Sequence, residues 1–171
     1  MDFETLVDEH STHIYRFCLS LTRHRDRAED LIQDVYIEVA KLLPRFATHP
    51  NPRALLFRVA ILRYRNSQRQ LARRHHIAPT DTLTPELSAT LSTGEHIENE
   101  LIAREEAALL NQLVHQLPDK YKLPIIMHYT NHLPLEQIAQ AMGIPKGTVK
   151  SRLHKARQLL KKGMMSHGYE A

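Results

Sequence analysis

Apolar side chains recur at helical intervals along the first 76 residues of the chain. In residues 2–22 they are Phe3, Leu6, Val7, Ile14, Phe17, Cys18 and Leu21. Residues 26–43 repeat this spacing, and a third helix is expected from residue 53 to about residue 75. The loop before it, residues 45–52, holds two prolines and should interrupt the helical structure. Residues 1–76 are therefore predicted to form a compact three-helix bundle.

A second helical unit is predicted after a stretch of different character. Residues 77–96 are rich in Thr, Ser and Pro without sustained periodicity, which is typical of a flexible linker. Helical patterns return at 97–117, 120–132, 135–142 and 147–162. Glycine is scarce, with 5 residues, and no alternating strand pattern is visible. The sequence predicts an all-α protein with two small helical domains, 1–76 and 97–167, joined by the linker 77–96.

Residues 134–162 carry the most specific local motif. An apolar face on 135–142 is followed by Gly143, where the chain must turn sharply, and then by a second helix with an apolar inner stripe. This pattern is a helix-turn-helix. The outer face of the second helix lacks acids and suits the major groove of DNA, although a solvated basic helix is the alternative. The DNA-binding candidates are Thr148, Lys150, Ser151, Arg152, His154 and Lys155.

Charge alternates in blocks along the chain, although the net charge is only +4. Residues 1–40 carry four Lys or Arg against nine acids, whereas residues 41–76 carry nine Lys or Arg and no acid. Residues 77–110 carry one Arg against seven acids, and residues 111–171 carry nine Lys or Arg against three acids. Two basic blocks indicate two contacts along one polyanion, and the acidic blocks indicate a basic protein partner or a spacer.

The first basic block lies on the predicted third helix. Four arginines share one face of it and two more lie nearby, namely Arg58, Arg65, Arg69, Arg73, Arg53 and Arg63. Such a face can grip phosphates or a separated strand, with Tyr64 or Phe57 available for base stacking. A solvated arginine face, with both aromatic rings in the core, is the alternative. The absence of any acid in this block favours nucleic acid.

An acidic ridge is predicted on the second helix. Asp30, Asp34 and Glu38 are spaced by four residues, so their carboxylates share a face. No partner residues that would make this a metal or acid–base site can be identified. Either the ridge docks on a basic protein or it is a plain solvated face.

Several classes of protein are excluded by what the sequence lacks. The single cysteine, Cys18, excludes an internal disulfide and fits a core position, and the 12 histidines show no zinc-like spacing. No catalytic triad or glycine-rich phosphate motif is visible. No segment approaches the roughly 20 apolar residues that span a bilayer, and a signal peptide is not recognisable. We expect a cytoplasmic protein that is not an enzyme and has no cofactor, metal or small-molecule substrate.

Five segments in order carry a resemblance to a known family. They are AEDLIQDVYIEVAKLLPRF, the arginine-rich helix, the polar linker, LPDKYKLPIIMHY and IAQAMGIPKGTVKSRLHKAR. Together they resemble the extracytoplasmic-function (ECF) subgroup of the sigma-70 family of bacterial RNA polymerase sigma factors. The resemblance covers nearly the whole chain except the linker and the last few residues. It implies a region 2 domain at 1–76 and a region 4 domain at 97–167, which bracket promoter DNA on the polymerase.

The resemblance also implies roles for particular residues. Asp30, Gln33 and Asp34 would dock on the clamp helices of the largest polymerase subunit. The −10 element would be captured and melted by residues 45–52 and the following helix. The −10 contacts expected there are Arg53, Arg58, Arg63, Asn66 and Arg69. The helix-turn-helix residues listed above would bind the −35 element, with Lys150, Ser151 and Lys155 reading bases.

The same resemblance implies further partners and three departures from the family pattern. Expected partners are the polymerase flap and an anti-sigma factor, which in this family is frequently a membrane protein. Leu55 stands where a Trp is usual, and Pro134 stands where a Ser or Thr commonly caps a helix. Leu62 stands where an Asn is frequent, and Asn66 is the nearby substitute for a contact to a flipped −10 base.

Two other functions are weighed against the sigma factor. A conventional helix-turn-helix regulator would bind duplex DNA without polymerase and explains residues 134–162 equally well. It leaves the DLIQDVYI motif and the acid-free block at 41–76 unexplained. A protein-interaction module that binds polymerase without reading promoters is the third class, and it would not need the basic groups of residues 148–157.

Overall fold

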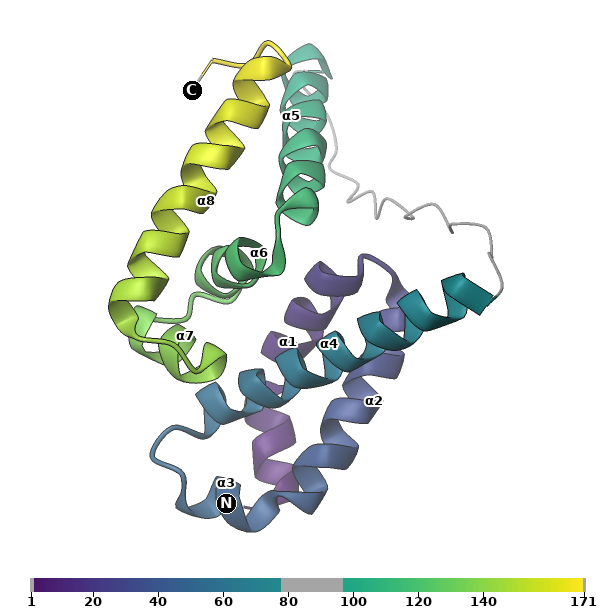
Figure 1. Cartoon of the computed structure of the whole chain (residues 1–171), viewed down its shortest axis with the longest axis vertical. Coiled ribbons are helices and arrows are strands. Elements are labelled where there is room, and N and C mark those ends of the chain that lie inside the picture. Colours follow the sequence, from purple (N-terminus) through teal and green to yellow (C-terminus); the bar gives the residue numbers. More distant parts are fainter. Residues whose placement is uncertain (1, 78–96, 171) are drawn as a thin grey trace.

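The computed structural model describes residues 2–77 and 97–170, and these ranges contain helices and no strand (Figure 1). The helices are α1 (Phe3–Thr22), α2 (Arg25–Lys41), α3 (Leu43–Thr48), α4 (Pro52–Ile77), α5 (Ile97–Gln116), α6 (Asp119–Ile125), the π-helix η1 (Ile126–Thr130), α7 (Leu135–Met142) and α8 (Lys146–Ser166). The predicted all-α class is confirmed. The predicted linker lies outside the described residues, except for Ile77 at the end of α4.

Helices α1, α2 and α4 form the bundle of the first unit, defined here as α1–α4. Helix α1 begins after Asp2, whose carboxylate accepts a hydrogen bond from the Thr5 amide at 2.8 Å and so satisfies an otherwise free donor. It ends at Arg23, which takes the left-handed conformation with φ 56°. In the core, the rings of Phe17 and Phe57 pack with 4.9 Å between their centroids, and both side chains are fully buried.

Residues 43–48 depart from the sequence prediction. The helix-breaking loop predicted at 45–52 is wrong for its first half, because α3 runs through it. Pro44 lies in the first turn of α3, where a missing amide hydrogen costs no helical hydrogen bond. The Asn51 side chain then caps α4 by accepting a hydrogen bond from the Ala54 amide at 3.2 Å. The predicted three-helix bundle therefore contains a fourth, short helix.

The second unit, α5–α8, contains the predicted helix-turn-helix. Helix α7 has the predicted bounds, and Gly143 follows it in the left-handed conformation with φ 66°. The single helix predicted at 120–132 is wrong, because α6 gives way to the wider turn of η1. This widening comes directly after Pro124, which has no amide hydrogen to donate to the helix.

The two units pack against each other, with α7 on α4 and η1 on α1 (Figure 1). Their buried apolar residues form one continuous cluster instead of the two separate small cores expected. The reason lies in α4, where six of the eight residues 54–61 are buried. A helix that packs on one side buries a single stripe, so this wide apolar surface needs neighbours on more than one side.

We expect Gly143→Ala to destabilise the fold, because the left-handed conformation costs a residue with a Cβ about 1 kcal/mol or more of conformational energy. A Cβ at this position would also lie 3.0 Å from the Arg58 guanidinium. Gly147→Ala is the matched control, because a Cβ there meets nothing within 4 Å and Gly147 has no positive φ. Urea denaturation followed by circular dichroism measures both midpoints. Equal midpoints for the two variants would contradict the strain assigned to Gly143.

Candidate nucleic-acid interface

The start of α4 faces the second unit. One Nη of Arg53 donates a hydrogen bond to the Asn131 carbonyl at 2.9 Å, and Arg58 Nη1 lies 3.4 Å from the Gln140 carbonyl. Partial burial lowers the pKa of the Arg53 guanidinium from its usual value. Two of the five predicted −10 residues therefore contact backbone carbonyls of the helix-turn-helix unit.

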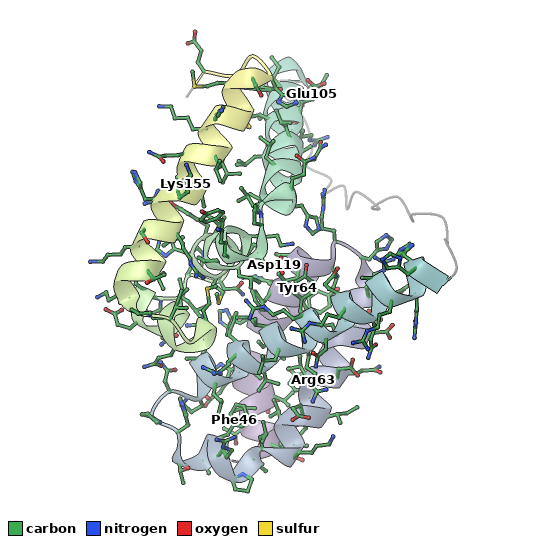
Figure 2. All side chains as sticks on the ribbon, in the orientation of Figure 1. Phe46, Arg63, Tyr64, Glu105, Asp119 and Lys155 are labelled. Carbon is green, nitrogen blue, oxygen red and sulfur yellow. The ribbon has the colours of Figure 1, made fainter. Side chains whose placement is uncertain are left out.

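The other three predicted −10 residues lie further along α4. Arg63 pairs with the Glu38 carboxylate of α2, which also lies 3.7 Å from the Lys41 ammonium (Figure 2). Asn66 and Arg69 are exposed. The structure thus distributes the five residues among three environments, and it leaves Asn66 and Arg69 as open surface.

The two aromatic side chains considered for base stacking are both in the core. Phe57 is fully buried and Tyr64 is 3% exposed, so neither offers a ring face to a nucleic acid. The alternative, with both rings in the core, is correct. The Tyr64 hydroxyl instead accepts a hydrogen bond from Lys122 of α6 at 3.1 Å (Figure 2).

Lys122 is a buried cation that the sequence reasoning missed. It is 6% exposed, and its ammonium lies 3.3 Å from the Asp119 carboxylate and 5.5 Å from the centre of the Tyr64 ring. A buried ammonium is costly unless it is paired, and these two neighbours supply the pairing. The sequence signal that could have indicated its burial is its place next to the apolar run at residues 123–127.

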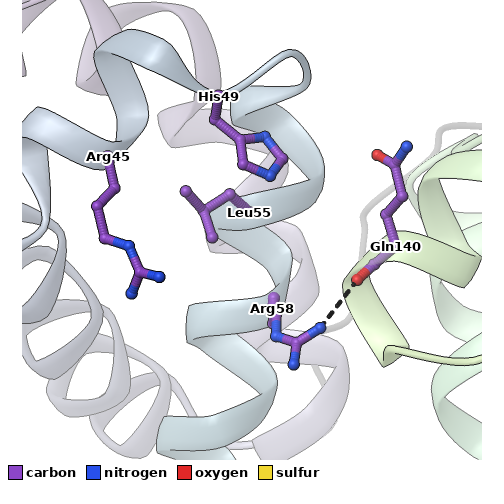
Figure 3. A pocket seen from close by; sticks show the side chains of 5 residues that line it. All are labelled: Arg45, His49, Leu55, Arg58 and Gln140. Carbon is purple, nitrogen blue, oxygen red and sulfur yellow. Dashed lines mark hydrogen bonds between the residues drawn. The ribbon is translucent and has the colours of Figure 1, made fainter.

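A cavity of about 340 Å³ lies between the start of α4 and the second unit (Figure 3). Its lining residues are Arg45, His49, Leu55, Arg58 and Gln140. The guanidinium groups come from α3 and α4, Leu55 supplies an apolar wall, and Gln140 comes from α7. The cavity includes part of the predicted −10 loop, and its lining combines two guanidinium groups with an apolar side chain.

The helix-turn-helix presents the residues predicted for it on α8. Val149, Leu153 and Ala156 are buried inward, so the opposite side of the helix faces solvent. Lys150, Ser151, His154 and Lys155 are exposed, whereas Thr148 and Arg152 are half-buried. Figure 2 shows Lys155 pointing away from the helix bundle. The six predicted residues are therefore on one helix, but only four of them are exposed, and the hydroxyl of one of these, Ser151, donates a hydrogen bond to the Thr148 carbonyl at 3.0 Å.

Two local contacts position α8. Lys146 at its start pairs with Glu136 of α7, and the hydrogen bond from Lys146 lowers the pKa of that carboxyl. Arg157 donates a hydrogen bond to the Tyr129 hydroxyl of η1 at 3.1 Å. Both contacts fix α8 against the elements that precede it, which gives its outer face a defined direction.

The predicted polymerase-docking residues lie on the outer side of α2. Asp30, Gln33 and Asp34 are exposed, whereas Glu38 is half-buried in its pair with Arg63. The acidic ridge expected from the four-residue spacing is therefore shorter than predicted. Ile37, which is 57% exposed beside it, adds an apolar group that the sequence reasoning did not include.

Three further features to consider are the single cysteine, possible metal ligands and possible membrane-spanning helices. Cys18 is buried in the core, and this burial raises the pKa of its thiol to about 12. Among the described residues, no cluster of three or more His, Cys, Asp or Glu side chains is arranged to hold a metal. None of the described helices is both long and apolar enough to cross a bilayer.

Comparisons with known proteins agree with this architecture. Residues 6–74 match the family described as Sigma-70 region 2, and residues 107–160 match Sigma-70, region 4. The chain is 29% identical to the ECF RNA polymerase sigma factor SigW of Bacillus subtilis over 164 residues, which are 94% of this chain and 87% of the relative. It is 32% identical to the ECF RNA polymerase sigma factor SigL of Mycobacterium tuberculosis over 158 residues, which are 91% of this chain and 85% of the relative.

Two solved structures share the fold. The sigma factor RpoE of Bartonella quintana, in complex with the anti-sigma factor NepR, has a TM-score of 0.72 at 21% identity over 96% of this chain and 97% of that chain. CnrH in complex with the cytosolic domain of CnrY has a TM-score of 0.67 at 18% identity over 98% of this chain and 89% of that chain. The predicted family is confirmed, and a conventional helix-turn-helix regulator is excluded. The chain belongs to the ECF group of the sigma-70 family, and it is a non-enzymatic initiation factor that directs RNA polymerase to promoters.

Proposed function

We propose that this sigma factor docks on core RNA polymerase through α2, melts the −10 element with α4 and residues 45–51, and reads the −35 element with α8. The observation that carries the proposal is the separation of charge between helices. Helix α2 has more acids than bases, with exposed carboxylates beside the exposed cations Arg25, Arg27 and Lys41, whereas α4 and α8 carry exposed cations and no acid. A basic protein surface and two segments of a polyanion can therefore bind one chain at the same time. In this proposal region 2 comprises 1–76, region 4 comprises 97–167, and 77–96 link them.

The polymerase contact in this proposal is made by Asp30, Gln33 and Asp34 with the clamp helices of the largest subunit. Their exposure supports it, since carboxylates without an internal partner are free to pair with basic groups. Ile37 lies on the same helix and is 57% exposed, so it adds apolar area to the contact. Region 4 would dock separately on the polymerase flap.

The −10 contact in this proposal uses Asn66 and Arg69 directly, because both are exposed. Leu62 is 50% exposed on the same helix and offers an apolar surface to an unstacked base. The cavity beside Leu55 supplies the pocket for a flipped base, with guanidinium groups for the adjoining phosphate. Arg53, Arg58 and Arg63 join the contact only after DNA replaces their present partners.

The −35 contact follows from the exposure of residues on α8. Lys150, Ser151 and Lys155 would meet base edges in the major groove, with His154 beside them. Thr148 and Arg152 are half-buried and would support the contact through the DNA backbone. This division assigns base reading to exposed side chains and positioning on the DNA to the two half-buried ones.

An anti-sigma factor is part of the proposal. One structural neighbour is the sigma factor RpoE in complex with the anti-sigma factor NepR, and the other is CnrH in complex with the cytosolic domain of CnrY. This chain shares the fold of both. We therefore expect this chain to be held inactive by such a partner, with a membrane protein as the expected form. Because its proposed partner is core polymerase, its place of action is the cytoplasm.

Run-off transcription with purified core polymerase on a library of random promoters tests the function as a whole. We expect transcripts that depend on the added protein and that share a two-part promoter. Sequencing the promoters that yield transcripts would identify the −35 and −10 elements directly. No protein-dependent initiation would refute the proposal.

Asp34→Lys should weaken binding to core polymerase at least about tenfold, because it reverses an exposed charge at the proposed docking surface. Asp8→Lys is the matched control, because Asp8 is an exposed acid on α1, outside the proposed surface. Fluorescence anisotropy with labelled protein measures both affinities, and circular dichroism checks that the helices remain. Equal affinity of the two variants would remove Asp34 from the docking surface.

Lys150→Ala should change the preferred −35 sequence, with a loss of about 1–3 kcal/mol on the best site. Arg157→Ala, in contrast, removes an exposed cation of α8 that lies outside the proposed base-reading residues, so it should weaken all sequences to a similar extent and reduce the salt dependence of binding. Competition between promoter variants bound by the holoenzyme, measured at several salt concentrations, separates the two effects. A sequence-independent loss for Lys150→Ala would assign this residue to phosphate binding instead.

A further inference from the structure

The cavity at the boundary of the two units gathers cationic side chains around an apolar one. Its volume is about 340 Å³, and its lining residues are Arg45, His49, Leu55 and Arg58 of the first unit and Gln140 of the second. No carboxylate lines it, and Glu136, the acid of α7, pairs with Lys146. The lining therefore carries a net positive charge, which attracts a small anion.

The cations at this cavity have hydrogen-bond donors to spare. Among the described residues, the Arg45 guanidinium has no hydrogen-bond or ion-pair partner, and Arg58 uses only Nη1, at 3.4 Å from the Gln140 carbonyl. His49 Nδ1 contacts the backbone of Asn51 at 2.8 and 3.0 Å, whereas its Nε2 has no partner in the part of the chain that the structure describes. A guanidinium carries five N–H donors in a fixed fork that matches phosphate oxygens. The cavity can therefore supply several donors to one phosphate.

The cavity belongs to both units. Arg58 reaches from α4 to the backbone of Gln140 on α7 (Figure 3). Its Nη1 also lies 3.0 Å from the position that a Cβ on Gly143 would take, so this guanidinium packs against the turn of the helix-turn-helix. Gln140 is exposed, so its side chain is accessible to a ligand. A molecule that fills the cavity would therefore touch both units at once.

The size and the apolar wall of the cavity indicate more than a lone phosphate. Small-molecule sites have volumes of roughly 300–1,000 Å³, and the 340 Å³ of this cavity lies within that range. Leu55 is half-buried and supplies an apolar surface, and the plane of a guanidinium can stack on an aromatic ring. The lining thus offers donors for a phosphate and apolar surface for a planar ring. A single nucleotide combines these two groups.

We propose that this cavity binds a free mononucleotide, with the phosphate on Arg45 and Arg58 and the base against Leu55, and that the bound nucleotide holds the two units together. Gln140 lines the site because α7 packs on α4, so a ligand that contacts Gln140 favours the packed state over a separated one. The same cavity is the proposed pocket for a flipped −10 base, so the nucleotide and the promoter compete for it. Only this competition rests on the proposed function, whereas binding of the nucleotide to the free chain does not.

Isothermal titration calorimetry of the full-length free chain with AMP, without polymerase or DNA, measures the binding. We expect a Kd of about 1 mM or tighter. Adenosine lacks the phosphate and inorganic phosphate lacks the base, so each should bind at least about tenfold more weakly than AMP. The proposal is overturned if AMP does not bind at concentrations up to about 10 mM. It is also overturned if adenosine or inorganic phosphate binds as tightly as AMP.

Arg45→Gln should weaken the binding of AMP at least about tenfold, because the charge-assisted hydrogen bonds to the phosphate are lost. Arg69→Gln is the matched control, because Arg69 is an exposed arginine of α4 that does not line the cavity. Circular dichroism checks that both variants keep their helices. Equal affinity of the two variants for AMP would remove the phosphate from the place proposed for it and overturn the assignment.

Gln140→Glu tests whether the second unit forms part of the site. The new carboxylate would face the phosphate from α7, so AMP should bind at least about tenfold more weakly. Gln158→Glu is the matched control, because it adds the same charge at an exposed position of α8 outside the cavity lining. Equal affinity of these two variants would show that the nucleotide does not bridge the units. Transcription with core polymerase is measured separately, so a failure here leaves the proposed function standing, and the reverse also holds.

Discussion

Burial of the wide apolar surface of α4 is the constraint on which the rest of the structure depends. Six of its residues between 54 and 61 are withdrawn from water, and they join one cluster with residues of α1, α2, α6, η1, α7 and α8. Burial of apolar area is the dominant favourable contribution to folding, so this helix determines where the second unit can sit. The remaining face of the same helix carries the arginines. One element thus organises the core and presents the nucleic-acid surface.

The polar contacts between the two units are weak enough to let the units separate from each other. A carboxylate partner for Arg53 or Arg58 would form a strong pair that DNA phosphates would have to break. The observed carbonyl acceptors form weaker bonds, since hydrogen bonds between two charged groups are stronger than those to neutral oxygens. Lys122 follows the same rule across the contact, because its partner there is the Tyr64 hydroxyl. Apolar burial supplies most of the attraction, while the polar groups add direction.

Local patterns in the sequence predicted most of the helices, because spacing and capping signals act within a few residues. Helix α7 has the predicted bounds, and the helix-turn-helix and its exposed basic residues lie where expected. The short helix α3 was missed because Pro44 lies in its first turn, where proline does not remove a helical hydrogen bond. The spacing of residues along the sequence also assigns them to one face of a helix, but it does not show which other element packs on that face. For this reason the burial of Tyr64, the pairing of Arg63 and the partners of Arg53 were not predictable from one sequence.

The far end of α4 differs from its start, because residues 72–76 are all exposed. This stretch includes Arg73 and Arg74, which are recognition residues for trypsin-like proteases, and helix ends without tertiary support open most readily. A protease that cuts here would sever the chain between the two units. The cut would fall outside the buried stretch of α4 that packs against the second unit, so the fragments would stay together as a nicked complex. Degradation of this protein would therefore need a step that pulls the units apart, not merely one that cleaves the backbone.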